Sequence, residues 1–242
     1  MEHQYRVLAG DMRNYKIRKR TEQMSYNIAV DGPAGAGKST IAKAVAKELN
    51  IIYVDTGAMY RGMGLYMLRR GIDPEDEQAV TAHCEEADIA LRYEDGVQVV
   101  CLNGENVNDY IRTEEVGTAT SRISAFPAVR RRVTALQKEL ASRVDCIMDG
   151  RDIGTCVLPD ADVKIYLTAS SAVRARRRYD ELTAKGQVCD LGRIQADMEE
   201  RDYRDMHREV SPLRQAEDAV LVDSSDLTPR QVIEKILELC RR

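Results

Sequence analysis

The chain has 242 residues, of which 43% are hydrophobic, and a formal net charge of −4, so it can bury one sizeable core or a core with a small appended module. The acidic balance excludes the global basic field on which nucleic-acid-binding proteins rely, and no apolar run approaches the ~18–20 residues of a membrane span. Six cysteines are scattered without a C-x-x-C pair, which is typical neither of a zinc site nor of a disulfide framework and indicates a reducing compartment, most simply the cytoplasm.

Residues 1–23 differ from the rest of the chain. They carry six basic and three acidic residues and show no clear apolar period. They lack the apolar segment of a secretory signal, and acids such as Asp11 and Glu22 argue against an organelle transit peptide. We expect a disordered extension, or an upstream start codon with Met24 as the functional start, and then a single domain over residues 24–242.

The most informative segment is a glycine-rich run that fits G-x-x-x-x-G-K-[ST], the phosphate-binding loop of nucleoside triphosphate enzymes. It follows an apolar strand predicted at residues 26–30 and precedes a helix predicted from apolar spacing over 40–49. Backbone N–H groups of such a loop surround the triphosphate, the lysine reaches the β- and γ-phosphates, and the serine hydroxyl ligates Mg²⁺. The predicted nucleotide-binding residues are Gly32, Pro33, Ala34, Gly35, Ala36, Gly37, Lys38, Ser39 and Thr40.

Strands and helices alternate along the chain after this loop. We predict strands at residues 51–55, 145–148, 163–167 and 219–222, and helices at 58–70 and 74–87. A last helix is predicted to begin at Thr228-Pro229, where Thr228 caps it and Gln231 completes a capping box. This order predicts an α/β fold with a P-loop NTPase-type parallel sheet flanked by helices.

One stretch interrupts the alternation. Short strands are predicted at residues 89–93, 97–102 and 105–107, separated by the turn signals Asp95-Gly96 and Asn103-Gly104. A three-stranded antiparallel module inside an α/β protein indicates an insert, over about residues 85–125. Its place in the chain suggests that it covers a second ligand.

A second candidate cluster lies at residues 149–155, directly after an apolar strand. Ligands of doubly wound sheets collect beyond the carboxyl ends of strands, and Arg151 between Asp149 and Asp152 is suited to grip a phosphate. From these residues alone, a salt-bridged turn is an equal alternative.

A third cluster is rich in arginine and runs from Arg174 to Arg208. Two helices are expected there, with a break at Lys185-Gly186, and Arg201, Asp205 and Arg208 share one face of the second helix. An exposed helix carrying ion pairs is the plain alternative. In a nucleotide-binding protein we favour a lid, over about residues 174–205, that closes on the phosphates and excludes water.

Taken together, these motifs closely resemble the bacterial-type cytidylate kinase family, in its longer form with the three-stranded insert. The resemblance covers about residues 26–239 and rests on five segments: 31–40, 55–61, 126–130, 149–155 and 200–205. The phosphate loop alone is shared by very many enzymes, whereas the segments 55–61 and 149–155 are together specific. Thr56 stands where many relatives have serine, so the hydroxyl is kept.

The resemblance implies a phosphotransferase that uses ATP and Mg²⁺ to convert CMP or dCMP to the diphosphate. It implies no nucleic-acid or membrane partner, and a monomer is the usual state of such kinases. Lys38 and Arg151 are the implied catalytic residues, with Arg174 and Arg177 in the lid. The implied acceptor-binding residues are Arg61 and Arg151 at the phosphate, Thr56 and Tyr60 along its pocket, Ser121, Arg130 and Asp152 at the cytosine, and Arg201, Asp205 and Arg208 near the sugar and phosphate.

Three other functions remain open from the sequence. A kinase on the same scaffold for UMP, AMP or shikimate is the nearest. A slowly hydrolysing nucleotide switch is the second, although the chain has no N-K-x-D guanine-reading motif. Nucleic-acid binding through residues 130–132 and 174–178 is disfavoured by the acidic balance.

Overall fold

The computed structural model describes residues 25–94 and 97–241, so the segment 1–23 and the predicted Asp95-Gly96 turn lie outside the described residues. The chain forms two compact units. The first unit is built on Asn50–Cys146, and the second on Tyr26–Leu49 together with the chain from Ile147 onward.

The strands form one parallel and one antiparallel sheet. They are β1 (Asn27–Asp31), β2 (Ile52–Asp55), β3 (Ile89–Glu94), β4 (Val97–Leu102), β5 (Glu105–Asn106), β6 (Cys146–Gly150), β7 (Val163–Thr168) and β8 (Val220–Asp223). The parallel sheet has the order β2-β6-β1-β7-β8, and the antiparallel sheet has the order β3-β4-β5. The predicted fold class and the predicted three-stranded insert are therefore both confirmed.

The helices are α1 (Lys38–Leu49), α2 (Thr56–Arg69), α3 (Glu77–His83), α4 (Glu114–Ile123), α5 (Pro127–Ala141), α6 (Ser171–Ala184), α7 (Leu191–His207) and α8 (Pro229–Cys240). The helices predicted at 40–49 and 58–70 and the start of the last helix at Thr228-Pro229 are confirmed within two residues, whereas α4 and α5 were not predicted from the sequence. Side-chain caps begin several helices: the carboxylate of Asp55 accepts the Ala58 N–H at the start of α2, and Thr228 and Gln231 form the predicted capping box of α8.

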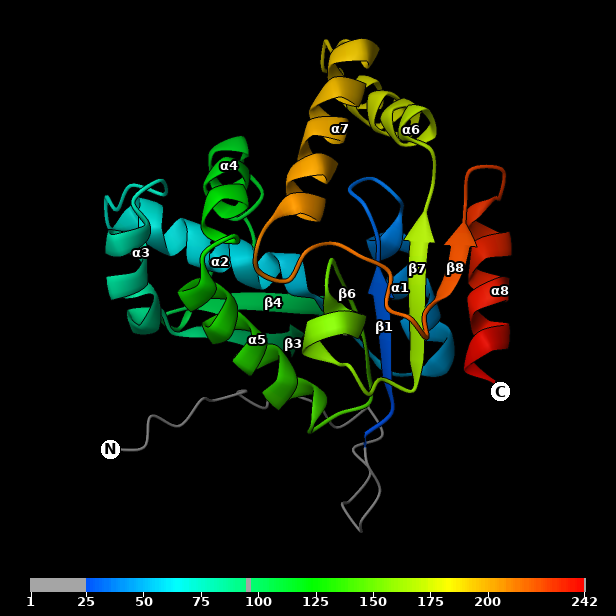
Figure 1. Ribbon diagram of the computed structural model, residues 1–242, viewed down its shortest axis with the longest axis horizontal. Helices are drawn as coiled ribbons and strands as arrows, with labels where there is room; N and C mark the ends of the chain where they lie inside the picture. Colours follow the sequence, from blue (N-terminus) through cyan, green and yellow to red (C-terminus); the bar gives the residue numbers. More distant parts are fainter. Residues whose placement is uncertain (1–24, 95–96, 242) are drawn as a thin grey trace. The chain divides into compact units, whose positions relative to one another are not determined.

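The second unit is centred on β1 and β7, which pair in parallel with Ile28 opposite Val163. The side chains of Ile28, Ile165 and Leu167 are almost fully buried, as expected for a parallel sheet whose strands are covered by helices. Helices α1 and α8 pack against each other. Figure 1 shows α6 and α7 beyond the arrowheads of β7 and β8. The carboxyl ends of the strands are therefore where this unit presents its loops and its arginine helices.

The first unit is held together by α2, which packs against α4, β3 and β4. The side chains of Met63 and Met67 on α2 are fully buried. At Gly64 an added Cβ would lie 2.6 Å from Oγ1 of Thr120 on α4, so the two helices approach closely because this position has no side chain. This packing fixes the N-terminal end of α2, where several of the predicted acceptor residues lie.

The predicted helix at residues 74–87 is shorter than expected. The structure has α3 only from Glu77 to His83, followed by a 3-10 turn at Cys84–Glu86. The N–H of Glu75 is bonded to the Asp73 carboxylate, and that of Ala79 is bonded to Asp76. These two acids form turns and a cap ahead of the helix, which delays its start.

Candidate active site

The glycine-rich segment between β1 and α1 forms a loop with an unusual backbone. Gly32, Gly35 and Gly37 all have positive φ, at 147°, 74° and 88°. At Gly32 an added Cβ would lie 1.9 Å from the carbonyl oxygen of Leu167, so no other residue fits without a backbone shift. The structure confirms the predicted loop, and its binding of a triphosphate stays a prediction.

Lys38, the first residue of α1, points back into this loop. Its Nζ donates to the carbonyl oxygens of Gly32 at 2.8 Å and Pro33 at 2.7 Å. Burial, and next the Arg151 guanidinium, lower the pKa of Lys38 from 10.5 to about 7, although Asp149 and Asp31 favour its charged form. A buried ammonium that shares its surroundings with a guanidinium is a site prepared for an anion.

Ser39 and Asp149 form the most informative contact that the sequence analysis did not anticipate. The Ser39 hydroxyl donates to Oδ2 of Asp149 at 2.8 Å, and the aspartate lies buried near the end of β6. From the sequence, Asp149 is expected only as a carboxylate that holds Arg151 or a donor group of the substrate. Its position at the carboxyl end of a strand of the phosphate-loop sheet was the signal that could have identified it. Together the two side chains offer hard oxygen donors of the kind that Mg²⁺ takes.

Asp31 is a second functional residue that the sequence analysis did not single out. Its two carboxylate oxygens accept the backbone N–H groups of Ile153 at 2.8 Å and Gly154 at 2.7 Å. These belong to a π-helical turn, Ile153–Val157. Burial raises the pKa of Asp31 from 3.8 to about 6, in spite of the two N–H groups. Asp31 thus ties the strand before the phosphate loop to the turn that follows Arg151 and Asp152.

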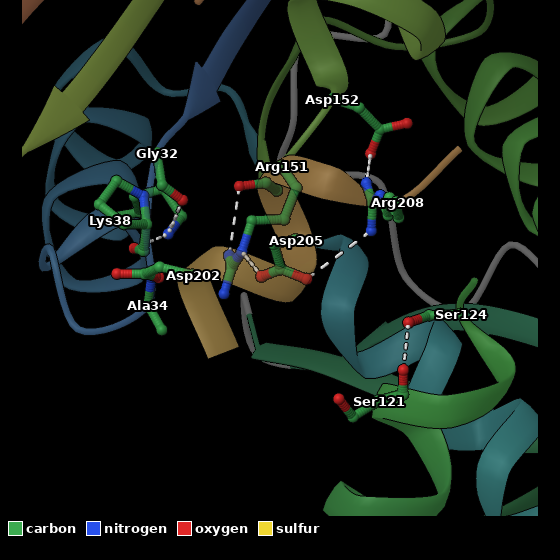
Figure 2. A network of polar contacts seen from close by, with 12 residues as sticks. Gly32, Ala34, Lys38, Ser121, Ser124, Arg151, Asp152, Asp202, Asp205 and Arg208 are labelled. Atoms are coloured by element: carbon green, nitrogen blue, oxygen red, sulfur yellow. Dashed lines mark hydrogen bonds and ion pairs between the residues drawn. The ribbon is translucent and has the colours of Figure 1, made fainter. Parts of the chain in front are cut away.

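Four of the predicted acceptor-binding residues form one network of arginines and carboxylates. Figure 2 shows Asp205 between Arg151 and Arg208. Nε of Arg151 donates to Oδ2 of Asp205 at 2.8 Å, Nη1 of Arg208 lies 3.9 Å from Oδ1 of Asp205, and Nη2 of Arg208 lies 3.5 Å from Oδ1 of Asp152. Burial opposes the ionisation of Asp205, but Arg151 and then the other arginines outweigh it and hold the pKa below its usual range.

This network brings residues of the segment 149–155 together with Asp205 of α7 and with Arg208, and it bears on the two alternatives left open for that segment. The segment is salt-bridged, as the plain alternative held. An incoming phosphate can nevertheless displace these carboxylates from the arginines, because it competes for the same guanidinium donors. Their contact with a substrate stays a prediction.

A cavity of about 650 Å³ lies over the phosphate loop within the second unit. It is lined by the loop and by both arginine helices, with the residues Ala34, Gly35, Gly37, Lys38, Ser39, Thr40, Arg174, Arg177, Arg178, Glu181, Asp197, Met198 and Arg201. Both predicted lid arginines line it, and the helices α6 and α7 are joined by a break at residues 185–190, as expected. Arg177 donates to the Ser224 carbonyl at 2.7 Å.

The remaining predicted acceptor residues lie in the first unit. Thr56 and Tyr60 are buried on the first turns of α2. Arg61 is paired with the capping residue Asp55 at 2.9 Å, and the guanidinium of Arg130 lies 5.6 Å from the centre of the Tyr60 ring. Arg130 also donates to the Ser124 carbonyl at 3.1 Å.

Ser121 joins this group through its backbone, since the Ser124 hydroxyl donates to the Ser121 carbonyl at 3.2 Å. The first unit therefore gathers a cation, an aromatic ring and hydroxyl groups at the facing ends of α2, α4 and α5. This mixture suits a polar, planar ligand, because a guanidinium and a ring provide flat surfaces and the hydroxyls provide directional hydrogen bonds.

Within residues 25–94 and 97–241, no cluster of three or more histidine, cysteine or acidic side chains is arranged to hold a metal ion. None of the helices in the described part of the chain is long and apolar enough to cross a membrane. All six cysteines are free thiols.

Comparison with known proteins gives consistent results. The family model for cytidylate kinase matches residues 28–242. A cytidylate kinase of Caldicellulosiruptor bescii is 48% identical over 213 residues, which are 88% of this chain and 94% of that protein. One of Lactobacillus johnsonii is 46% identical over 226 residues, 93% of this chain and 98% of that protein. One of Desulfitobacterium hafniense is 48% identical over 215 residues, 89% of this chain and 92% of that protein.

Proposed function

Because this chain belongs to the cytidylate kinase family, we propose that it transfers the γ-phosphoryl group of ATP to CMP or dCMP, with ADP and CDP or dCDP as products. The observation that carries this proposal is the match over residues 28–242, which includes the phosphate loop, the arginine–carboxylate network and the insert. The expected division into a kinase domain over 24–242, with an acceptor-binding insert and a lid, is part of the proposal.

The donor nucleotide binds at residues Gly32–Thr40. Loops with this backbone direct their N–H groups at phosphate oxygens, and the start of α1 adds its positive dipole end. Lys38 leaves the carbonyl oxygens that hold it now and contacts the β- and γ-phosphates. The cavity of about 650 Å³ over the loop is large enough for a nucleotide, and Arg174 and Arg177 border it from the lid.

Mg²⁺ is the cofactor proposed with ATP. Its donors on the protein are the Ser39 hydroxyl and the Asp149 carboxylate, which lie 2.8 Å apart. In phosphate-loop enzymes a serine or threonine of the loop and an aspartate at a strand end hold this ion. When bound, the ion neutralises charge that develops on the phosphate oxygens.

The proposed acceptor-binding residues come from residues 56–61, from the segment 121–130, from Arg151 and Asp152, and from the arginine-rich cluster that ends at Arg208. Arg61 and Arg151 contact its phosphate, with Thr56 and Tyr60 along the pocket, and Arg201, Asp205 and Arg208 contact the sugar and the phosphate. Ser121, Arg130 and Asp152 read the base. A carboxylate at Asp152 accepts a hydrogen bond from the exocyclic amine that cytosine has and uracil lacks, so this residue favours CMP over UMP.

The chemistry needs no general base and no protein nucleophile, because the acceptor oxygen of a nucleoside monophosphate is already ionised. The protein contributes by placing the two phosphates in line and by stabilising the charge between them. Lys38 and Arg151 are the residues proposed for that stabilisation. Closure of the lid excludes water, which would otherwise accept the phosphoryl group.

The test is an ADP-release assay with Mg-ATP and separate CMP, dCMP, UMP, AMP and shikimate acceptors. Rapid turnover confined to CMP and dCMP is the expected result. Turnover with another acceptor would retain the kinase and overturn the roles given to Ser121, Arg130 and Asp152. Hydrolysis of ATP without any acceptor would favour a nucleotide switch, and retention on DNA that falls steeply with salt would favour a nucleic-acid-binding protein.

The proposed setting is the cytoplasm, since six free thiols are stable in a reducing compartment. The proposed state is a monomer without nucleic-acid or membrane partners. Light scattering of the purified chain tests the monomeric state directly, because a dimer would double the molar mass.

A further inference from the structure

One peptide of the phosphate loop is held by a buried ion pair. Oδ1 of Asp202 on α7 accepts the backbone N–H of Ala34 at 3.1 Å. Nη1 of Arg174 on α6 donates to the Ala34 carbonyl at 2.8 Å and also to Oδ2 of Asp202 at 2.6 Å. The two side chains are only 7% and 9% exposed. Both polar groups of Ala34 are thus fixed by one pair of charges from the two arginine helices.

Arg174 is itself anchored, because its Nε donates to the carbonyl of Ala169 at 2.9 Å. Ala169 directly follows β7, so the clamp is connected to the sheet that carries the loop. Hydrogen bonds to charged groups are roughly twice as strong as neutral ones. The pair therefore holds Ala34 against a rigid part of the second unit.

The loop needs an external support of this kind. Gly35 and Gly37 follow Ala34 with positive φ, and glycine gives the chain more conformational freedom than any other residue. At Gly35 an added Cβ would lie 3.0 Å from Cε of Met198 on α7 and 3.4 Å from Cβ of Arg174 on α6. The helices α6 and α7 therefore close directly over the flexible part of the loop.

The position of Asp202 on α7 adds a connection to the acceptor side. It follows Arg201 and precedes Asp205 by three residues, so Asp202 and Asp205 are neighbours along one side of the helix. Figure 2 shows Asp202 beside Ala34, and Asp205 beside Arg151. A single helix thus contacts the donor loop through one aspartate and the Arg151 network through another.

We propose that Arg174 and Asp202 are positioning residues that fix the Ala34 peptide, and with it the N–H groups of the phosphate loop, in the arrangement that binds the triphosphate. This proposal rests on the proposed use of ATP. The pair does not touch the reacting atoms. Its contribution is preorganisation, because a loop that is already ordered loses less entropy when the nucleotide binds.

The test uses the full chain and a double variant, Arg174→Met/Asp202→Leu. Removal of one partner would leave a lone buried charge, whereas exchange of both for apolar residues of similar volume is often neutral for stability. We expect a melting temperature near that of the wild type. The dissociation constant and the KM for Mg-ATP should rise about tenfold or more, as is typical when hydrogen bonds to charged groups are lost. The KM for CMP should change less than the KM for Mg-ATP, because the pair binds the phosphate loop directly and reaches the Arg151 network only through α7.

The matched control is Ser171→Ala/Glu199→Gln. The Ser171 hydroxyl donates to Glu199 at 2.6 Å and so also joins α6 to α7, at an exposed place away from the loop. This variant should keep the wild-type KM for ATP. Arg174→Lys, whose ammonium can still donate to Ala34 and pair with Asp202, should recover most of the affinity for ATP.

Two results would overturn the proposal: a folded double variant with wild-type affinity for Mg-ATP, or equal losses in the double variant and its control. If the double variant does not fold, Asp202→Asn decides, since it removes the charge without a change of size and must weaken Mg-ATP binding about threefold or more. Calorimetric titration with Mg-ATP alone keeps the two proposals apart. A wild-type protein that binds ATP but phosphorylates neither CMP nor dCMP would refute the function and still allow the pair to be tested.

Discussion

A change of pH from 6 to 8 should weaken the binding of Mg-ATP through a single buried lysine. Burial and the neighbouring Arg151 hold the pKa of Lys38 at about 7. In the free protein the ammonium is therefore mostly protonated at pH 6 and mostly neutral at pH 8. The triphosphate needs the charged form, because the lysine contacts the phosphates as a cation. Above the pKa, binding must include the uptake of a proton.

The size of the effect follows from the pKa of about 7 for Lys38, because pH 6 and pH 8 each lie one unit away from it. At pH 8 about 90% of the free protein carries a neutral Lys38, so binding takes up about 0.9 proton and the affinity is about tenfold below that of the protonated form. A tenfold loss of affinity corresponds to about 1.4 kcal/mol of binding free energy. Calorimetric titration of Mg-ATP in two buffers with different ionisation enthalpies measures the number of protons taken up.

The matched control is Lys38→Arg, because a guanidinium stays charged over this range and takes up no proton on binding. The reasoning is refuted if the wild type and Lys38→Arg show the same proton uptake at pH 8. An affinity of the wild type that does not change between pH 6 and pH 8 would refute it equally.

Three further predictions concern other residues of the second unit. Arg151→Ala should lower kcat by about 10²–10³, the usual effect of removing one charge-stabilising donor, with the melting temperature little changed. The control is Arg230→Ala, at an exposed ion pair on α8. Near-normal turnover of Arg151→Ala would contradict the role given to Arg151. Gly32→Ala should lower the free energy of unfolding by about 2–4 kcal/mol, because a Cβ there meets a backbone carbonyl at 1.9 Å. Gly186 also has positive φ, but the space around it is open, so Gly186→Ala should lower the free energy of unfolding by only about 1 kcal/mol. Urea unfolding measures both variants, and equal losses of stability in the two would disprove the steric argument. For Asp31, the folded pKa of about 6 lies above the ordinary 3.8, so the folded state holds a proton that the unfolded state has lost. The free energy of unfolding should therefore fall by about 2 kcal/mol between pH 4 and pH 6. A pH dependence that is the same in Asp31→Asn would rule this out.

The sequence predicted the architecture well where local signals were strong. Alternating apolar runs identified the parallel strands, and Thr228 with Gln231 identified the start of the last helix, because these signals act within a few residues. The helix predicted at 74–87 was wrong at its start, since the turns made by Asp73 and Asp76 compete with a helix and both outcomes use the same residue types.

The residues of the candidate site likewise fall into those that the sequence could predict and those that it could not. The phosphate loop could be read directly, because its chemistry lies in consecutive residues with a fixed spacing. The roles of Asp31 and Asp149 could not, because each aspartate acts on a partner more than one hundred residues away in the chain. Nothing in the local sequence distinguishes an aspartate that binds a distant backbone N–H from one that faces water.

By itself, the sequence determined the fold class, the phosphate loop and the motifs of a kinase family. Only the tertiary structure decided which charges meet. Arg174 of α6 pairs with Asp202 of α7 and donates to Ala34 of the phosphate loop, and Arg208 lies beside Asp152. The physical reason is that backbone conformation depends mainly on neighbours in the chain, whereas the partner of a charged side chain, and with it the pKa of Lys38, depends on which distant segments exclude water around it.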